Sequence, residues 1–158
     1  MKEIKLTRGM STFVDDEDFD FLSKNKWAAL FPQGKNIKRV YAVRWSHGKL
    51  LLMHREILKP PSNLCVDHAN GDCLNNQRNN LRLATRSQNT MNKKVVKTGA
   101  ATEYRGVWFD KRSGLWVSYI QENKIKHRIG TFSTAIEAAK AYDVASFKYH
   151  GEFGRRNF

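Results

Sequence analysis

Residues 64–92, LCVDHANGDCLNNQRNNLRLATRSQNTMN, limit the possible folds of this chain more than any other segment. They are rich in Asn, Asp and His and contain few long apolar runs. Val66–His68 reads as the end of a strand, the Asn-Gly pair after it is typical of a turn, and the later Leu-Arg-Leu-Ala run alternates like a second strand. A short helix, capped by Thr85 or Ser87, is expected to run to about Lys94. The segment therefore predicts a hairpin packed on a helix, which can hold a divalent metal ion.

The side chains of this segment suit metal-assisted hydrolysis. Asp67 offers carboxylate oxygens and Asn89 an amide oxygen, and oxygen donors favour Mg²⁺ or Mn²⁺ over Zn²⁺. His68 is the side chain here with a near-neutral pKa, so it is the natural general base. In the alternative interpretation, Asp67 and His68 are structural and the Asn-rich loop only satisfies its own backbone. Adjacent strand residues point to opposite faces, so Asp67 and His68 share a site only if the strand ends or twists there.

The spacing of this segment carries a family resemblance. The pattern D-H-x-N-G-D-x-L-N-N-x-R-x-N-L-R-x-A-T-x-x-Q-N starts at Asp67, and a His-Arg pair at His54 precedes it. In this pattern, residues 53–92 resemble the HNH endonucleases, in particular the compact homing endonucleases encoded in phage introns. The resemblance implies hydrolysis of phosphodiester bonds that leaves a 5′-phosphate and a 3′-hydroxyl. It also implies that His68 activates water as the general base and that Asn80 ties the loop backbone in place.

The same resemblance implies that Asp67 and Asn89 are the metal ligands. Many members of the family have His at the third motif position, whereas this chain has Asn89, as in the homing subgroup, which argues against Zn²⁺. Arg86 either contacts the scissile phosphate or is a solvated residue at the start of the helix. His54 is expected to be a packed structural histidine rather than a ligand.

The first 60 residues read as mixed strands with one short helix. The helix is expected from Asp15 to Lys24, with acidic residues in its first turn, where the helix dipole favours carboxylates. A metal site at this acidic cluster is the less favoured alternative. The runs with strand composition are Ile4–Leu6, Phe13–Val14, Trp27–Phe31 and Val40–Trp45.

The C-terminal part has a regular pattern of three strands followed by one helix. Short turns separate the strands, so the sheet is expected to be antiparallel. The helix, from about Thr134 to Tyr149, starts with a capping box of Thr134 and Glu137, and Gly151 follows its end. The expected strands are Tyr104–Phe109, Leu115–Gln121 and Ile125–Thr131.

Period-two alternation separates a strand face toward the helix from an outward face that is aromatic and cationic. Such a face suits DNA, because a sheet can enter the major groove; the alternative is an ordinary solvated face. The side chains expected to face the helix are Val107, Phe109, Trp116, Ser118, Ile120 and Ile129, and those expected to face outward are Trp108, Tyr119, Gln121, Lys126 and Arg128.

Three motifs lie in the C-terminal part: Y-R-G-V-W at 104–108, I-G-T-F at 129–132 and E-A-A-K-A-Y-D at 137–143. In these motifs, residues 103–158 resemble the APETALA/ethylene-response-factor DNA-binding domain. Trp108 and Gln121 stand where that family usually has Arg, so its preferred DNA site is not transferred. The residues expected to bind DNA, from this resemblance and from the outward face, are Arg105, Trp108, Tyr119, Gln121, Lys126, Arg128 and Thr131.

The charge of the chain agrees with a nucleic-acid partner. Its formal net charge of +13 favours polyanions. Its two cysteines do not form a disulfide framework, and neither a signal-peptide core nor a bilayer-spanning apolar stretch is seen in the sequence. The expectation is therefore an intracellular protein with no membrane partner, in the cytoplasm of a bacterial or phage-infected cell.

Together these features predict an α+β protein. Mixed N-terminal strands lead into a ββα-metal (HNH) nuclease unit, and a three-stranded antiparallel sheet packed on one helix follows. The expected boundaries are a nuclease domain at 1–94, a basic linker at 95–102 and a DNA-binding domain at 103–158.

The predicted function is site-specific cleavage of double-stranded DNA with Mg²⁺ or Mn²⁺, as a homing-type nickase. No obligate protein partner is evident, and a monomer is favoured over a dimer because no heptad stripe is present. The alternatives are a non-catalytic DNA-binding regulator and a dimeric HNH restriction enzyme.

Overall fold

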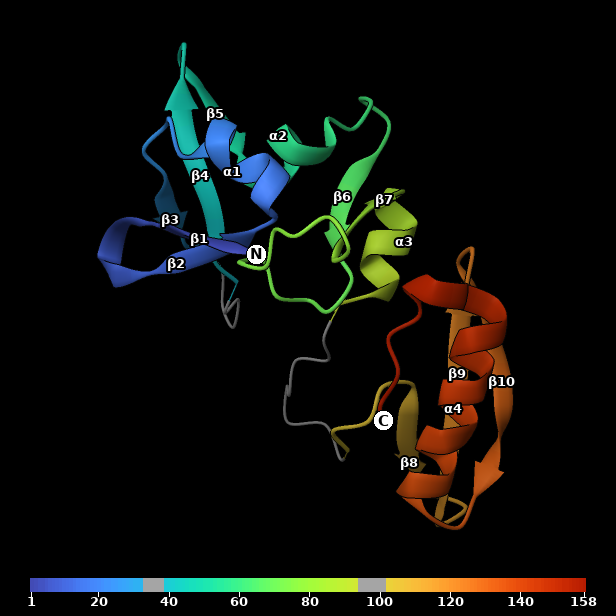
Figure 1. Ribbon diagram of the computed structural model, residues 1–158. Helices are drawn as coiled ribbons and strands as arrows, with labels where there is room; N and C mark the ends of the chain where they lie inside the picture. Colours follow the sequence, from blue (N-terminus) through green and yellow to red (C-terminus); the bar gives the residue numbers. More distant parts are fainter. Residues whose placement is uncertain (33–38, 94–101) are drawn as a thin grey trace. The chain divides into compact units, whose positions relative to one another are not determined.

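The computed structural model describes residues 1–32, 39–93 and 102–158. The described residues form four α-helices and four small sheets whose strands pair antiparallel, a mixed α+β architecture (Figure 1). The chain divides into two compact units, residues 1–89 and 90–158. The linker predicted at 95–102 lies outside the described residues except for its last position. Of the helices described, none is long and apolar enough to cross a membrane.

A hairpin and a short acidic helix open the first unit. The hairpin pairs Lys2 with Val14, and its turn places Arg8 in the left-handed region at φ 62°. The helix carries three acidic residues in its first turn, as the sequence predicted, because carboxylates there interact favourably with the helix dipole. The elements are β1 (Lys2–Lys5), β2 (Ser11–Val14) and α1 (Asp16–Leu22).

A three-stranded sheet follows in the order β3-β4-β5, with a short helix directly after its last strand. The first two strands correspond to predicted ones, whereas the third does not, because its Lys-Leu-Leu-Leu sequence has no alternation that would indicate a strand. The elements are β3 (Ala28–Leu30), β4 (Tyr41–Ser46), β5 (Lys49–Leu52) and α2 (Met53–Leu58).

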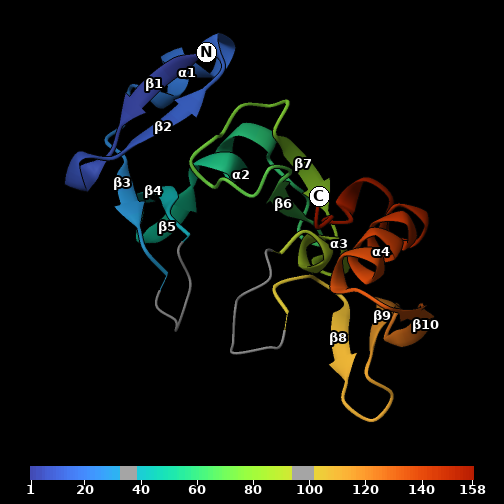
Figure 2. The same cartoon turned by 90° about the horizontal axis from the view of Figure 1, so that it is seen from below.

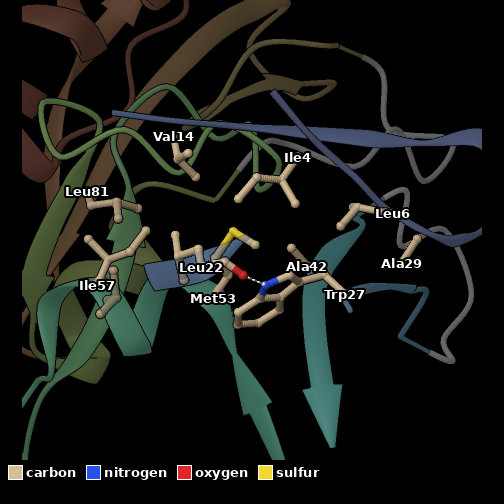
Figure 3. Packing of buried hydrophobic residues seen from close by; sticks show 11 residues of the cluster. Ile4, Leu6, Val14, Leu22, Trp27, Ala29, Ala42, Met53, Ile57 and Leu81 are labelled. Carbon is tan, nitrogen blue, oxygen red and sulfur yellow. Dashed lines mark hydrogen bonds between the residues drawn. The ribbon is translucent and has the colours of Figure 1, made fainter. Parts of the chain in front are cut away.

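One hydrophobic core joins these elements to the predicted hairpin (Figure 3). Trp27 lies within it, and its indole N–H donates to the backbone oxygen of Leu22 at 2.9 Å, which satisfies the only polar atom of the ring. Val66 and Leu81 belong to the hairpin and pack in the same cluster. The buried residues are Ile4, Leu6, Val14, Leu22, Trp27, Ala29, Ala42, Met53, Ile57, Val66 and Leu81.

The predicted hairpin and helix are present as β6 (Cys65–His68), β7 (Leu81–Ala84) and α3 (Arg86–Met91). Thr85 caps the helix: its hydroxyl accepts from the Gln88 N–H at 3.2 Å, and the Gln88 side chain accepts from the Thr85 N–H at 2.8 Å. The helix ends at Met91, before the predicted Lys94. Asn92 directly follows this end, and Asn is one of the residues that commonly end a helix.

The second unit is a three-stranded sheet in the order β10-β9-β8, with one face covered by a helix (Figure 2). Thr134 and Glu137 form the predicted capping box, and Gly151 ends the helix at φ 55°. The inner face packs through Val107, Trp116 and Ile120, as the alternation predicted. The elements are β8 (Val107–Asp110), β9 (Leu115–Glu122), β10 (Ile125–Phe132) and α4 (Ala135–His150).

The first strand of this sheet starts three residues later than predicted, because the backbone turns at Gly106. This glycine has φ 71°, and a Cβ there would lie 2.1 Å from the ring of Tyr142. Its carbonyl accepts from the N–H of Tyr119 at 2.8 Å. Only glycine tolerates both the positive φ and the close approach of the Tyr142 ring. Tyr104 and Arg105, which precede this turn, therefore lie outside the strand.

Candidate active site and nucleic-acid interface

One face of the β6–β7 hairpin carries Asp67 and its cross-strand neighbour Arg82. The Oδ2 atom of Asp67 accepts hydrogen bonds from Nε of Arg82 at 2.9 Å and from Nη2 at 2.8 Å. Cys65 lies two residues before Asp67 and so shares this face. The side-chain amide of Asn89, in α3, donates to the Cys65 sulfur at 3.6 Å. Asp67 and Asn89 therefore lie against the same face of the hairpin.

His68 lies on the opposite face, where the residue is buried and only 5% exposed. The ring of His54, from α2, meets it edge to face with centroids 5.0 Å apart, and the Tyr41 ring lies 6.4 Å away. The strand ends at His68, which is the condition for Asp67 and His68 to share a site. The two side chains nevertheless leave the strand on different faces. His54 is buried, which agrees with a packed histidine.

A chain of buried hydrogen bonds sets the tautomer of the neutral His68 ring. The Thr12 hydroxyl donates to the Leu74 carbonyl at 2.6 Å and accepts from Nδ2 of Asn76 at 2.7 Å. The Asn76 oxygen therefore faces His68, at 3.2 Å from Nε2. Because a carbonyl oxygen only accepts, Nε2 carries a proton, and Nδ1 is the basic nitrogen of the neutral ring. The sequence did not identify Thr12 and Asn76 as partners of this histidine.

Burial keeps both histidines of this cluster neutral near pH 7. It lowers the pKa of His54 to about 3, with smaller contributions from the nearby His68 and Arg55. Burial also lowers the pKa of His68, although the hydrogen bond with Asn76 and the charge of Asp67 act in the opposite direction. His68 is therefore in the form that accepts a proton.

Asn80 ties together the loop that follows His68. Its side-chain oxygen accepts from the Asn70 N–H at 3.0 Å, and its side-chain amide donates to the Asn75 carbonyl at 2.8 Å. Its backbone oxygen accepts from the Ala69 N–H at 2.8 Å. Three bonds from one residue thus connect the two ends of the loop.

The acidic helix start also anchors this loop. Asp18, which is 2% exposed, accepts from Nε of Arg78 at 2.8 Å and from Nη2 at 2.7 Å. Asp15 accepts from the backbone N–H of Arg78 at 2.7 Å, and Glu17 adds an ion pair at 2.6 Å. The carboxylates that the sequence assigned to the helix start therefore also hold Arg78, a contact between segments about 60 residues apart.

The residues at the hairpin fit a hard divalent cation better than zinc. Asp67 and Asn89 offer oxygen, and the Asn89 nitrogen is turned toward Cys65. In residues 1–32, 39–93 and 102–158, no three His, Cys, Asp or Glu side chains are grouped to hold a metal ion. Mg²⁺ suits such a sparse site, because it is commonly held by one or two carboxylates plus water and substrate phosphate. Arg86 is exposed at the first position of α3.

The outer face of the C-terminal sheet is aromatic and basic. Trp108 is 48% exposed, and its ring lies 6.5 Å from that of Tyr119, centroid to centroid. Nζ of Lys126 lies 4.0 Å from the centre of the Tyr119 ring. Cross-strand pairing places Lys126 beside Gln121 and Arg128 beside Tyr119. The alternation thus brings these residues to one face, as predicted.

Two further predicted DNA-binding residues have other surroundings. Thr131 is exposed in β10, and its hydroxyl accepts from Nη2 of Arg128 at 2.5 Å. Arg105 precedes the sheet, and its backbone N–H donates to the Asn157 side chain at 2.7 Å. Arg105 is therefore not one of the residues that alternate along the strands.

The two parts of the chain match two protein families. Residues 59–91 match the family of HNH endonucleases, and residues 102–152 match the AP2 domain. A protein of Acanthamoeba polyphaga mimivirus, named as an uncharacterized HNH endonuclease, is 33% identical over 156 residues, which are 95% of this chain and 76% of the relative. No solved structure matches the chain significantly.

Plant transcription factors match the C-terminal part alone. APETALA2-like protein 2 of Oryza sativa subsp. indica is 41% identical over 58 residues, 37% of this chain and 13% of that protein. An ethylene-responsive transcription factor of Arabidopsis thaliana is 49% identical over 57 residues, 35% of this chain and 31% of the relative. Both resemblances seen in the sequence are confirmed, and the viral relative matches nearly the whole chain. The chain belongs to the HNH endonuclease family and carries an AP2 domain in its C-terminal part.

Proposed function

We propose that the protein is a homing-type, site-specific endonuclease that nicks one strand of double-stranded DNA with a His68 base and one Mg²⁺ or Mn²⁺ ion. The main support for this proposal is the β6–β7 hairpin, which carries Asp67 on the face that Asn89 of α3 contacts and which ends at His68. The scissile phosphate would lie at this end of the hairpin, where it is reached from both faces.

His68 takes the proton of the attacking water on Nδ1. The Thr12–Asn76 chain supports this role, because it keeps the proton of the neutral ring on Nε2. Asn80 keeps the following loop in one conformation. Arg86, exposed at the start of α3, would contact the phosphate. Cleavage leaves a 5′-phosphate and a 3′-hydroxyl.

Asp67 and Asn89 would hold the metal ion. When bound, the ion neutralises the charge that develops on the phosphate and on the leaving 3′-oxygen. A single motif of this kind serves one phosphodiester at a time, and the two strands of a duplex run antiparallel. A monomer fixed in one orientation by its AP2 domain therefore nicks one strand, whereas concerted cutting of both strands needs a symmetric dimer.

A plasmid library of random inserts tests this proposal. With Mg²⁺, we expect open-circular product and no early linear product, and strand-specific end sequencing should place the nicks on one strand of a common site. Linear product with matched ends on both strands would have one of two meanings. If the protein is a dimer on DNA, the result would favour the dimeric restriction enzyme. If it is a monomer on DNA, the result would refute the nickase. Selective binding without any cleavage would favour the regulator.

Lys126→Ala should weaken DNA binding, because Lys126 lies exposed on the outer face of the AP2 sheet beside Gln121. Loss of one phosphate contact is expected to reduce the slope of log Kd against log salt by about 1. Lys140→Ala is the matched control, since it removes the same charge from an exposed position of α4, which covers the other face of the sheet. Fluorescence anisotropy over a salt series measures both. Equal losses in the two variants would show that overall charge, rather than this face, determines binding.

A further inference from the structure

We propose that Arg82 controls when the metal ion is loaded. In the DNA-free enzyme, its guanidinium is hydrogen-bonded to the carboxylate of Asp67. This contact keeps the affinity of the site for Mg²⁺ or Mn²⁺ low until a DNA phosphate binds. The inference rests on the proposed role of Asp67 as a metal ligand.

The position of Arg82 is set by the hairpin itself. It lies directly opposite Asp67 in the β6–β7 register, and its Nε and Nη2 atoms both donate to Oδ2 of that carboxylate. The Arg82 side chain is 17% exposed and that of Asp67 is 6% exposed. Water therefore screens this pair little, and a cation that approaches the carboxylate meets a second positive charge nearby.

The charges at this face explain why DNA would be required. Asp67 contributes one negative charge, Arg82 cancels it, and Asn89 is neutral. A divalent ion at a poorly hydrated site needs compensating anions. The scissile phosphate supplies one, and it also offers the guanidinium a partner whose geometry matches two parallel N–H donors. Arrival of DNA thus makes it possible for Arg82 to exchange the carboxylate for the phosphate.

A second ion pair of the same unit serves as the control. Arg44 donates from Nε at 3.1 Å and from Nη2 at 2.7 Å to one oxygen of Glu56, with side-chain exposures of 19% and 23%. It joins β4 to α2 and includes no residue proposed to bind metal. An arginine of similar burial and bonding can therefore be removed without touching the proposed metal ligands.

Titration of the DNA-free, full-length protein with Mn²⁺, with free ion followed by electron paramagnetic resonance, tests the inference. Arg82→Gln should raise the Mn²⁺ affinity about tenfold or more. An arginine within about 4–6 Å stabilises a carboxylate by about one to three logarithmic units, and a metal ion that binds Asp67 must displace that interaction. Arg82→Lys, which keeps the charge, and Arg44→Gln should both bind as weakly as the wild type. Unchanged or weaker binding by Arg82→Gln would overturn the inference.

A measurement on the wild type does not depend on how the variants fold. Its Mn²⁺ affinity should rise about tenfold or more when a duplex with an uncleavable linkage at the nick site is added. Equal affinity with and without that duplex would also overturn the inference.

One double variant separates this inference from the proposed function. Adding Asp67→Asn to Arg82→Gln should abolish the gained affinity. If the gain persists, the ion binds elsewhere and Asp67 is not the ligand, which refutes the proposed metal site as well. If Asp67→Asn stops metal-dependent cleavage but Arg82→Gln leaves the affinity unchanged, only the role of Arg82 is refuted.

Discussion

His68→Ala should cleave DNA about 10²–10⁴ times more slowly than the wild type, the usual contribution of a general base, while it binds DNA nearly as well. Binding is expected to persist because His68 is only 5% exposed and contributes little surface to a ligand. Single-turnover cleavage and anisotropy measure the two effects. His47→Ala, at an exposed position, is the control for loss of an imidazole. Cleavage by His68→Ala at the wild-type rate would rule out this base.

The pH dependence of the wild type follows from the same histidine. A base acts only when unprotonated, so the rate should fall as the pH drops through the pKa of His68. Burial lowers that pKa, so the midpoint is expected below the ordinary value of 6.5. The Asn76 hydrogen bond raises that pKa, so in Asn76→Leu the midpoint should move to still lower pH.

Asn76→Leu should also slow cleavage, because it removes the acceptor that keeps the proton on Nε2 of the neutral ring, while DNA affinity should stay unchanged.

Asp67→Asn should reduce Mg²⁺-dependent cleavage about 10²-fold or more, because an ion that polarises a phosphoryl oxygen supplies several kcal/mol and each 1.4 kcal/mol is a factor of ten. Asn keeps an oxygen for the Arg82 guanidinium, whereas Ala would remove the acceptor of both hydrogen bonds from Arg82 to this position. Chelation with EDTA should stop the wild-type enzyme, and Mg²⁺ or Mn²⁺ should restore it.

Metal titrations of the cleavage rate make this second prediction specific. Asp67→Asn and Asn89→Ala should both need more Mn²⁺ for half-maximal rate than the wild type. Asp20→Ala, which removes an exposed carboxylate from α1, should not. Full activity of the wild type in chelator would contradict a metal site of any kind.

Local features of the sequence predicted the local elements well. Hydrogen-bonding side chains at a helix start act within three residues, so the capping box of Thr134 and Glu137 was predictable. The strand that ends at His68 follows likewise from the turn signal after it. The start of β8 was predicted wrongly, because the reason for the turn at Gly106 is the Tyr142 ring, 36 residues along the chain.

The candidate site was predictable only as a set of side chains. Residue type and spacing identify Asp67 and Asn89 as candidate metal ligands and His68 as a candidate general base. They do not show that Asp67 is held by Arg82 or that His68 is held by Asn76, since these partners depend on strand register and on a contact across the core. Pairing across a sheet is decided by tertiary packing, which a single sequence does not display.

The chain of bonds from Thr12 through Asn76 to His68 has a consequence for transplanting this nuclease. Thr12 and Asn76 are 64 residues apart, and the match to HNH endonucleases begins only at residue 59. A fragment that holds the motif alone lacks the hydroxyl that orients Asn76, and it also lacks most of the shared core. The smallest portable cutting module in this protein therefore begins at its first hairpin rather than at its signature motif.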